Sequence, residues 1–223
     1  MPVVDIILAR HGQTDANSED RMQGSTLNQP LNAVGERQAE ALAAALKDAR
    51  LGLIVTSALD RAIQTGRRVA RYHPAAAVMQ DARLNMTSWG ALNGALYEEA
   101  RGQLEAVFGR WAAGDFGAKV SGGESASDSQ ARVRAAFADI LRAAHEGGHR
   151  RVFVCLHGGT TMVAMASLVD RDLRRMAAYT HTNCSFYHIR TELDAAQPVT
   201  DPAELRFEPV RLDVRDHLAA GAA

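Results

Sequence analysis

Basic side chains stand at or shortly after the ends of three short apolar runs of the 223-residue chain. Arg10 and His11 follow residues 3–8, Arg61 comes shortly after residues 51–56, and His157 follows residues 151–156. A guanidinium group is a planar fork that matches the oxygens of a phosphate group, and an imidazole can act as a nucleophile or a base. Each residue alone is ordinary, because Arg61 also fits a solvated position on a helix. They predict an anion site only if the fold brings them together.

The apolar runs predict strands, because they are short and rich in β-branched residues. Strands are expected at residues 3–8, 51–56, 76–79, 151–156, 184–189 and 205–212. Helices are expected at residues 33–49, 98–113, 125–146 and 158–169, and one more helix is expected to begin within residues 57–65. An irregular loop is expected at residues 81–94. This alternation predicts a three-layer α/β/α sandwich with a mostly parallel central sheet. We expect one domain over residues 1–223, with a frayed tail at about 213–223.

The carboxyl ends of parallel strands meet at one edge of a sheet, where ligands bind in open α/β folds. We therefore expect Arg10, His11, Arg61 and His157 to converge there. Two glycines follow His157 at a strand-to-helix turn, where backbone N–H groups can approach an anion. The arginines would hold a phosphate group, and one of the histidines would attack phosphorus to give a phosphohistidine that water hydrolyses. Such a pocket needs no metal, since side chains supply the positive charge.

The motifs around these residues resemble those of the histidine phosphatase superfamily, in its phosphoglycerate mutase-like branch. The shared motifs span about residues 3–190 and are Arg10-His11-Gly12-Gln13-Thr14-x-x-Asn17, Gln23-Gly24, Pro30-Leu31, Gly35-x-x-Gln38-Ala39, Ser57-x-x-x-Arg61-Ala62-x-Gln64-Thr65, Gly123-Glu124-Ser125 and His157-Gly158-Gly159. The resemblance implies a three-layer α/β/α fold and a phosphohistidine on His11. It also implies that Arg10, Arg61 and His157 complete the phosphate pocket, and that the substrate is bound by Asn17, Gln23, Gly24 and Gly158.

One position departs from the pattern of this family. The branch carries a glutamate two residues after an Arg-Leu pair, as the general acid that protonates the leaving oxygen, and here that position holds Met86. Other members carry an aspartate directly after the second histidine, where this chain has Gly158. The preceding residues 83–85 follow the mutase frame, but residues 86–89 do not, and Asn28 replaces a usual aspartate. Four carboxylates are candidates for a substitute acid, although surface or capping roles explain them better: Asp81, Glu98, Glu99 and Glu124.

We therefore expect a phosphomonoesterase that acts through phospho-His11 on a small phosphorylated substrate. Losing a general acid costs about 10²–10⁴-fold in rate, and the loss matters least for aryl or acyl phosphates, whose leaving groups are acidic. The enzyme is then slow or favours good leaving groups. The alternative is a catalytically silent relative that binds phosphorylated ligands, and a third is a phosphoglycerate mutase. Met86 also fits a purely structural role, in which its side chain fills a gap in the packing of the loop. Trp89 is either a core residue or an apolar wall for an aromatic or lipid-like phosphate.

Composition narrows the remaining function classes. The net charge of −1 and the pI of about 6.7 give no sign of a nucleic-acid surface. The chain has no run of 18 apolar residues and no signal-peptide pattern, so we expect no contact with a membrane. Cys155 and Cys184 are too few for a disulfide framework or a zinc cluster, which favours a cytoplasmic protein without metal or cofactor. A homodimer is left open. Five further histidines lack metal-ligand spacing and are taken as surface or structural: His73, His145, His149, His181 and His188.

Overall fold

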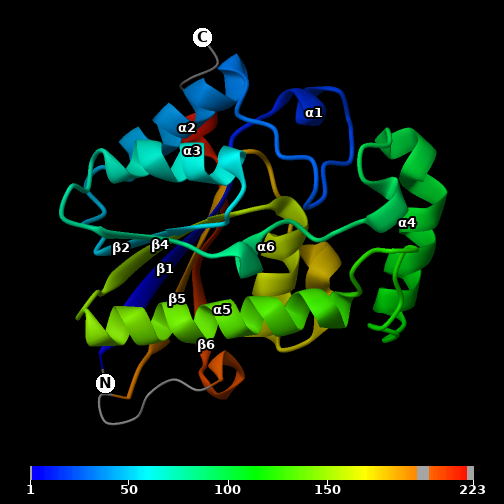
Figure 1. Ribbon diagram of the computed structural model, residues 1–223. Coiled ribbons are helices and arrows are strands. Elements are labelled where there is room, and N and C mark those ends of the chain that lie inside the picture. Colours follow the sequence, from blue (N-terminus) through cyan, green and yellow to red (C-terminus); the bar gives the residue numbers. More distant parts are fainter. Residues whose placement is uncertain (1, 195–200, 220–223) are drawn as a thin grey trace.

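A six-stranded sheet forms the centre of the protein, which a computed structural model describes over residues 2–194 and 201–219 (Figure 1). The strands are β1 (Val3–Arg10), β2 (Leu53–Thr56), β3 (Ala77–Gln80), β4 (Arg151–Leu156), β5 (Phe186–Glu192) and β6 (Phe207–Val214). Their order in the sheet is β3-β2-β4-β1-β5-β6. The first four are parallel to one another, whereas β5 is antiparallel to β1 and β6 is antiparallel to β5. The expected α/β class with a mostly parallel sheet is confirmed.

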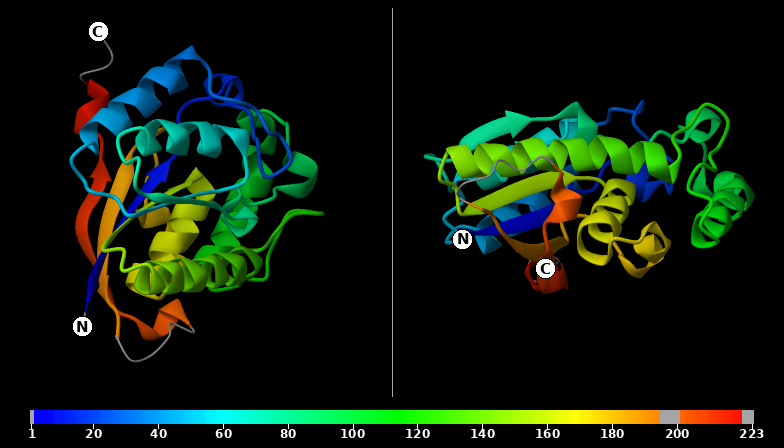
Figure 2. Two further views of the ribbon diagram at one scale, coloured as in Figure 1. Left: turned by 60° about the vertical axis from the view of Figure 1, so that its left-hand side comes forward. Right: turned by 90° about the horizontal axis from the view of Figure 1, so that it is seen from below.

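Helices cover both faces of this sheet, as Figures 1 and 2 show. One face carries α2 (Ala33–Ala45), α3 (Asp60–Ala70) and α7 (Asp216–Ala219), and the other carries α5 (Ala126–Glu146) and α6 (Gly158–Met165). The short α1 (Asp15–Ser18) and the longer α4 (Tyr97–Ala112) lie away from these layers. Four 3₁₀ turns (Ala82–Leu84, Gly90–Leu92, Leu173–Ala178, Pro202–Glu204) and one π-helical turn (Ala166–Asp170) complete the elements. Across residues 2–194 and 201–219, every helix is too short or too polar to cross a bilayer.

The alternating side chains of β1 divide the interior into two cores. Ile6 and Leu8 belong to the core that contains Phe137 of α5, whereas Ile7 belongs to the core that contains Leu42 of α2. Successive side chains of a strand point to opposite faces, so a strand that is apolar at every position must be covered on both sides. Residues 6–8, which are apolar at successive positions, therefore contact both cores, and β1 lies in the middle layer.

The ends of two helices show how well their predicted bounds hold. Ser125 accepts a hydrogen bond from the Asp128 N–H, and the Asp128 carboxylate accepts one from the Ser125 N–H, so a capping box fixes the start of α5. Helix α2 ends at Ala45 rather than near residue 49, because the Leu46 N–H already bonds to the carbonyls of Leu42 and Ala43 in a closing turn. The long helix was predicted to within a residue, and the shorter one was predicted too long.

The chain beyond residue 212 is ordered where it is described, contrary to the expected frayed tail. Val214 is buried in β6, and α7 follows at once. The ring of His217 lies 5.7 Å from that of Phe186, and Leu218 packs against the core beneath α2. The prediction was wrong for residues 213–219 because these contacts come from a strand far earlier in the chain; residues 220–223 lie outside the described residues.

The carboxyl ends of β1, β4 and β2 lie side by side. Arg10 is paired with Leu156, and Thr56 is paired with Cys155. The residue that follows each strand therefore stands at the same edge of the sheet, which brings His11, Ser57 and His157 together. The predicted convergence of the basic residues follows directly from this register.

Candidate active site

A cavity of about 470 Å³ opens at this edge of the sheet. Seven of the eight residues expected in the site line it: Arg10, His11, Asn17, Gln23, Gly24, Arg61 and Gly158. The eighth, His157, lies behind the cavity wall, with its ring centroid 5.0 Å from that of His11. Residues from β1, the following loop, α3 and α6 thus form one site.

His11 directly follows β1 and is almost fully buried. Its Nδ1 lies 2.7 Å from the carbonyl oxygen of Gly12. A carbonyl can only accept, so Nδ1 carries the proton and Nε2 is left with the lone pair. Burial, together with the positive charges of Arg61 and Arg10, holds the pKa of His11 well below its usual value. The ring is therefore neutral at neutral pH, which is the form that can attack an electrophile.

Arg61, in the first turn of α3, is 1% exposed and makes three hydrogen bonds. Its Nε donates to His157 Nδ1 at 3.2 Å, and its Nη1 and Nη2 donate to the carbonyls of Leu27 and Gly24 at 3.0 and 3.1 Å. One guanidinium group thus holds both the second histidine and the loop that carries Gly24. The charge of Arg61 is buried beside the cavity, and burial is the main reason that its pKa falls to about 10.

The contacts of His157 determine its tautomer. Its Nδ1 accepts from Arg61, so its Nε2 carries the proton and donates to Ser57 Oγ at 2.7 Å. Burial and the charge of Arg61 hold the pKa of His157 well below its usual value. Both ring nitrogens are therefore bonded within the protein, and His157 acts here as the support of Arg61 and Ser57.

Arg10, the last residue of β1, stands on the other side of His11. Its Nη1 donates to the carbonyl oxygen of His181 at 2.9 Å. Its Nε is buried and has no partner among the described residues, and the same is true of Gln23 Oε1. Buried polar groups are normally hydrogen-bonded, so unpartnered ones beside a cavity indicate a polar ligand. Asn17 is held by Asn183, whose Nδ2 donates to Asn17 Oδ1 at 3.2 Å and to the His11 carbonyl at 3.0 Å.

Sequence reasoning missed several polar residues of the cavity, and two of them, His181 and Asn183, bond to predicted site residues. His181 was taken as surface or structural, but its Nδ1 lies 3.4 Å from Arg10 Nη1, and it lines the cavity. Both residues belong to the loop before β5, which has neither a periodic pattern nor a place in the expected row of strand ends. Their only signal is the polar character of a loop that packs against β1.

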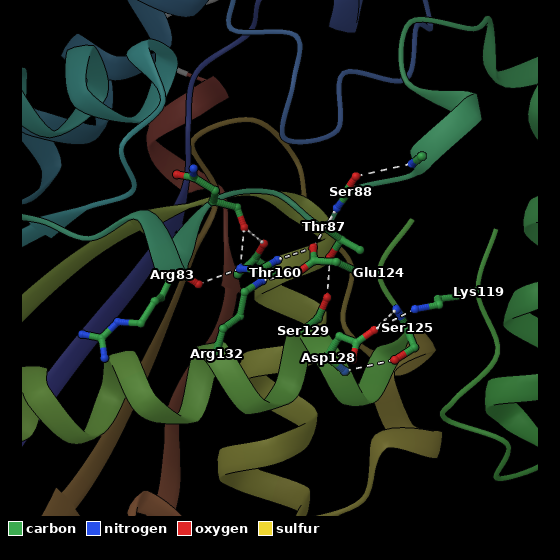
Figure 3. Close-up of polar contacts among 12 residues, drawn as sticks. Arg83, Thr87, Ser88, Lys119, Glu124, Ser125, Asp128, Ser129, Arg132 and Thr160 are labelled. Atoms are coloured by element: carbon green, nitrogen blue, oxygen red, sulfur yellow. Dashed lines mark hydrogen bonds and ion pairs between the residues drawn. The ribbon is translucent and has the colours of Figure 1, made fainter. Parts of the chain in front are cut away.

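The loop of residues 81–94 is irregular, as expected, and is fastened to α5 and α6 on both sides of position 86 (Figure 3). The Asn85 carbonyl accepts from Thr160 Oγ1 at 2.9 Å and from Arg132 Nη1 at 2.8 Å. Thr87 Oγ1 lies 3.2 Å from Ser129 Oγ. These bonds fix the backbone at position 86.

Met86 lines the cavity between these anchors. A Cβ atom added to Gly159 would lie 2.9 Å from Met86 Cε, so the thioether packs against the first turn of α6. None of the four carboxylates considered as substitute acids lines the cavity. Each is held elsewhere: Asp81 by Arg83, Glu98 by Arg101, Glu99 by the Leu96 N–H, and Glu124 by Arg132. Among the described residues that line the cavity, Asp20 is the one carboxylate, and it is exposed.

Much of the remaining cavity wall is apolar, although Arg21 and Tyr97 also line it. Trp89 is buried and forms an aromatic cluster with Phe108 and Trp111, at centroid distances of 5.7 and 6.1 Å. It is therefore a core residue that also lines the cavity, and an aromatic or lipid-like phosphate against it stays a prediction. The other apolar lining residues include Met22, Leu104, Phe108 and Met162.

The site can be compared with those of known proteins. The family model of the histidine phosphatase superfamily (branch 1) matches residues 6–200. The chain is 32% identical to glucosyl-3-phosphoglycerate phosphatase of Mycobacterium tuberculosis over 74% of each chain. It is 29% identical to the probable phosphoglycerate mutase GpmB of Enterobacter sp. (strain 638), over 84% of this chain and 85% of that protein.

Solved structures show the same similarity. The structure of mycobacterial glucosyl-3-phosphoglycerate phosphatase Rv2419c in complex with VO3 superposes with a TM-score of 0.81 and 27% sequence identity. The alignment covers 95% of this chain and all of that one. Motifs, sheet topology and family match agree, and this protein belongs to branch 1 of the histidine phosphatase superfamily.

Proposed function

We propose that the protein is a metal-independent phosphomonoesterase that acts on a small phosphorylated substrate through a phosphohistidine on His11. The observation that carries the proposal is the state of His11: a neutral, buried imidazole whose Nε2 carries the lone pair, in the cavity that Arg10 and Arg61 also line. The names of the mycobacterial relatives, which are phosphatases of a phosphorylated sugar acid, support the same class of reaction.

The reaction begins with attack of His11 Nε2 on phosphorus. The P–O bond to the leaving group breaks, and its electron pair goes to the leaving oxygen. Arg10 and Arg61 stabilise the charge on the remaining phosphoryl oxygens by charge-assisted hydrogen bonds, so the side chains supply what a metal would otherwise supply. Water then attacks the phosphohistidine, and the P–N electron pair returns to His11.

Met86 is proposed to stand where the branch carries its general-acid glutamate. A thioether cannot donate a proton, so the leaving oxygen gains no help from position 86. The protein is then expected to favour esters whose leaving groups are acidic, because these depart without protonation. The apolar wall around Trp89 and Phe108 suits an aryl group as leaving group.

The test is steady-state turnover of an aryl phosphate and an alkyl phosphate by the wild type, His11→Ala and Met86→Glu, each with and without EDTA. We expect the wild type to favour the aryl ester, His11→Ala to abolish turnover, and EDTA to change nothing. Met86→Glu is expected to raise alkyl turnover by about 10²-fold or more, because the anchored loop presents position 86 to the cavity. Full activity of His11→Ala would contradict the phosphohistidine mechanism.

The second candidate function is a silent relative that binds a phosphorylated ligand. It is favoured by the cavity wall, where the half-buried Met86 packs against α6 and Asp20 is exposed. Inorganic phosphate binding without turnover of either ester would support it. The third candidate is a mutase, in line with the name of the Enterobacter relative. Transfer of phosphate between the two hydroxyl groups of phosphoglycerate would be its mark.

Two further parts of the proposal concern the setting of the enzyme. Cys155 and Cys184 are buried free thiols, which suits a reducing compartment such as the cytoplasm.

A homodimer is proposed through β3, an edge strand with exposed Val78 and Met79. Light scattering tests it, because a dimer has twice the 24.0 kDa mass of the chain.

A further inference from the structure

The cavity holds a second imidazole that the proposed reaction has not yet used. His181 lines it together with Arg10 and His11. Arg10 Nη1 donates to the His181 carbonyl at 2.9 Å and lies 3.4 Å from His181 Nδ1. A phosphate oxygen on Arg10 would be held at about 2.8 Å from its nitrogen. The imidazole therefore lies within a few ångströms of the place where a phosphate ester would bind.

The position of the ring depends on the residue after His157. A Cβ atom added to Gly158 would lie 2.6 Å from His181 Nδ1 and 2.7 Å from its Cε1, closer than real side chains come. The absence of a side chain at position 158 thus makes room for the imidazole at the first turn of α6. Gly158 and His181 are 23 positions apart in the sequence and are matched in space.

We propose that His181 donates the proton to the leaving oxygen, in the role that position 86 does not fill. The proposal rests on the proposed phosphatase function and deepens it. Among the described residues that line the cavity, Asp20 is the one carboxylate, and it is taken as the main competing donor. Asp20 is exposed, and its carboxylate has no hydrogen-bond partner in the described part of the chain, whereas His181 is held at Arg10.

Protons and electron pairs balance over the two steps when His181 is the proton donor in the first step and the proton acceptor in the second. When the P–O bond breaks, the leaving oxygen takes its electron pair and then a proton from the His181 imidazolium, which becomes neutral. In the second step, neutral His181 accepts a proton from the water that attacks phosphorus, and the P–N electron pair returns to His11. The products are the alcohol and phosphate, and His181 is protonated again.

The charges around His181 make this donor dependent on the substrate. Burial and the positive charge of Arg10 lower the pKa of His181 to about 4, and Asp213 opposes this effect. Asp213 is itself paired with Arg215, and His11 also faces the ring. A phosphate dianion on Arg10 brings negative charge beside the ring, which favours the imidazolium. His181 can then donate a proton to the leaving oxygen of a bound ester. We expect the rate gain from this donor to be smaller than that from a dedicated carboxylic acid.

The experiment compares the wild type, His181→Gln and the control Asp20→Asn on a series of phosphate esters with leaving groups from good aryl to poor alkyl. His181→Gln is expected to lower kcat/KM for the alkyl ester by about 10²-fold or more and for the best aryl ester by less than about 3-fold. The plot of log kcat/KM against the acidity of the leaving group therefore becomes steeper. Asp20→Asn leaves the slope unchanged. Adding Met86→Glu to His181→Gln restores alkyl turnover, which a misfolded variant could not do.

Other outcomes decide against His181. An equal loss on both esters, with phosphate binding retained in calorimetry, makes His181 a positioning residue for Arg10 and overturns the proposal. A steeper slope in Asp20→Asn rather than in His181→Gln moves the role to Asp20. If the wild type turns over both esters and His181→Gln matches it, only this inference falls. If the wild type turns over neither, the proposed function falls with it.

Discussion

At the scale of single residues, the site depends on groups that each satisfy several partners. Arg61 is the clearest case, because its three nitrogens bond to His157, Leu27 and Gly24 while its charge faces the cavity. A guanidinium fork can do this in one fixed geometry, whereas an ammonium group is a point charge on a flexible chain. Loss of the Arg61 guanidinium group would release both His157 and the loop before α2 that carries Gly24.

We predict that Arg61→Lys lowers kcat/KM for an aryl phosphate by about 10²-fold or more, because it removes oriented donors from the transition state and from the surrounding carbonyls. Arg68→Lys is the matched control, since Arg68 lies on the same helix and pairs with Glu36 at the surface. It is expected to change kcat/KM by less than about 2-fold. Steady-state kinetics of the two variants are the measurement, and similar values for both would contradict the role assigned to Arg61.

At the scale of elements, the loop of residues 81–94 is positioned by side chains of α5 and of the segment before it. Arg132 donates to Glu124 at 2.7 Å and to the carbonyls of Arg83 and Asn85 at 2.6 and 2.8 Å. Glu124 in turn accepts from the Ser88 N–H at 2.8 Å. Figure 3 shows these groups meeting between the loop and the helix. The carboxylate that the sequence offered as an acid is thus part of the support of the loop.

Arg132→Gln is predicted to lower the free energy of unfolding by about 1–3 kcal/mol, because it removes the Arg132 donors from two loop carbonyls and breaks the ion pair with Glu124. Urea unfolding measures this change. The control is Arg142→Gln on the same helix, whose ion pair with Asp139 is exposed and is worth less than about 1 kcal/mol. The variant should also raise KM, as the wall around Met86 loosens. An equal stability of Arg132→Gln and Arg142→Gln would show that the loop does not depend on this pair.

At the scale of the whole molecule, several histidines are buried in their neutral form around one cavity. Burial and the nearby arginines hold the pKa values of His11 and His157 well below the usual 6.5. The unfolded chain binds protons on these rings below about pH 6.5, while the folded protein does not. Stability is therefore full above pH 6.5 and falls as the pH drops toward the folded-state values. Carboxylates with lowered pKa, such as Asp5, add their own loss only in more acidic solution, below about pH 4.

We predict that His11→Gln lowers the slope of the free energy of unfolding against pH, between about pH 6 and 5, by about 1.4 kcal/mol per pH unit. The reason is that the variant takes up one proton fewer when it unfolds. His157→Gln is expected to give the same reduction for its own ring. Urea unfolding at several pH values measures the slopes. A slope that stays at its wild-type value in both variants would mean that these rings titrate normally in the folded protein.

The positions of the strands along the chain, the mostly parallel sheet and the convergence of the basic residues could be predicted from the sequence, whereas the order β3-β2-β4-β1-β5-β6 comes from the structure. Short β-branched runs identify strands, and the geometry of parallel sheets requires the residues after β1, β2 and β4 to meet at one edge. For the same reason Arg10, His11 and Arg61 were placed correctly from their positions alone. His157 was placed in the right cluster, although the structure puts it behind the cavity, where both ring nitrogens are bonded.

The tertiary structure decided which side chains lie near those residues and which side chains are already bonded to other partners. His181 reaches Arg10 across 171 positions of the chain, and Gly158 makes room for it. Glu124 is bound to Arg132, and Met86 is fixed by anchors on two helices. Local patterns determine strands, caps and strand ends because these depend on neighbours in the sequence. The partners of a loop side chain depend on packing between distant segments, and only the folded chain brings those segments into contact.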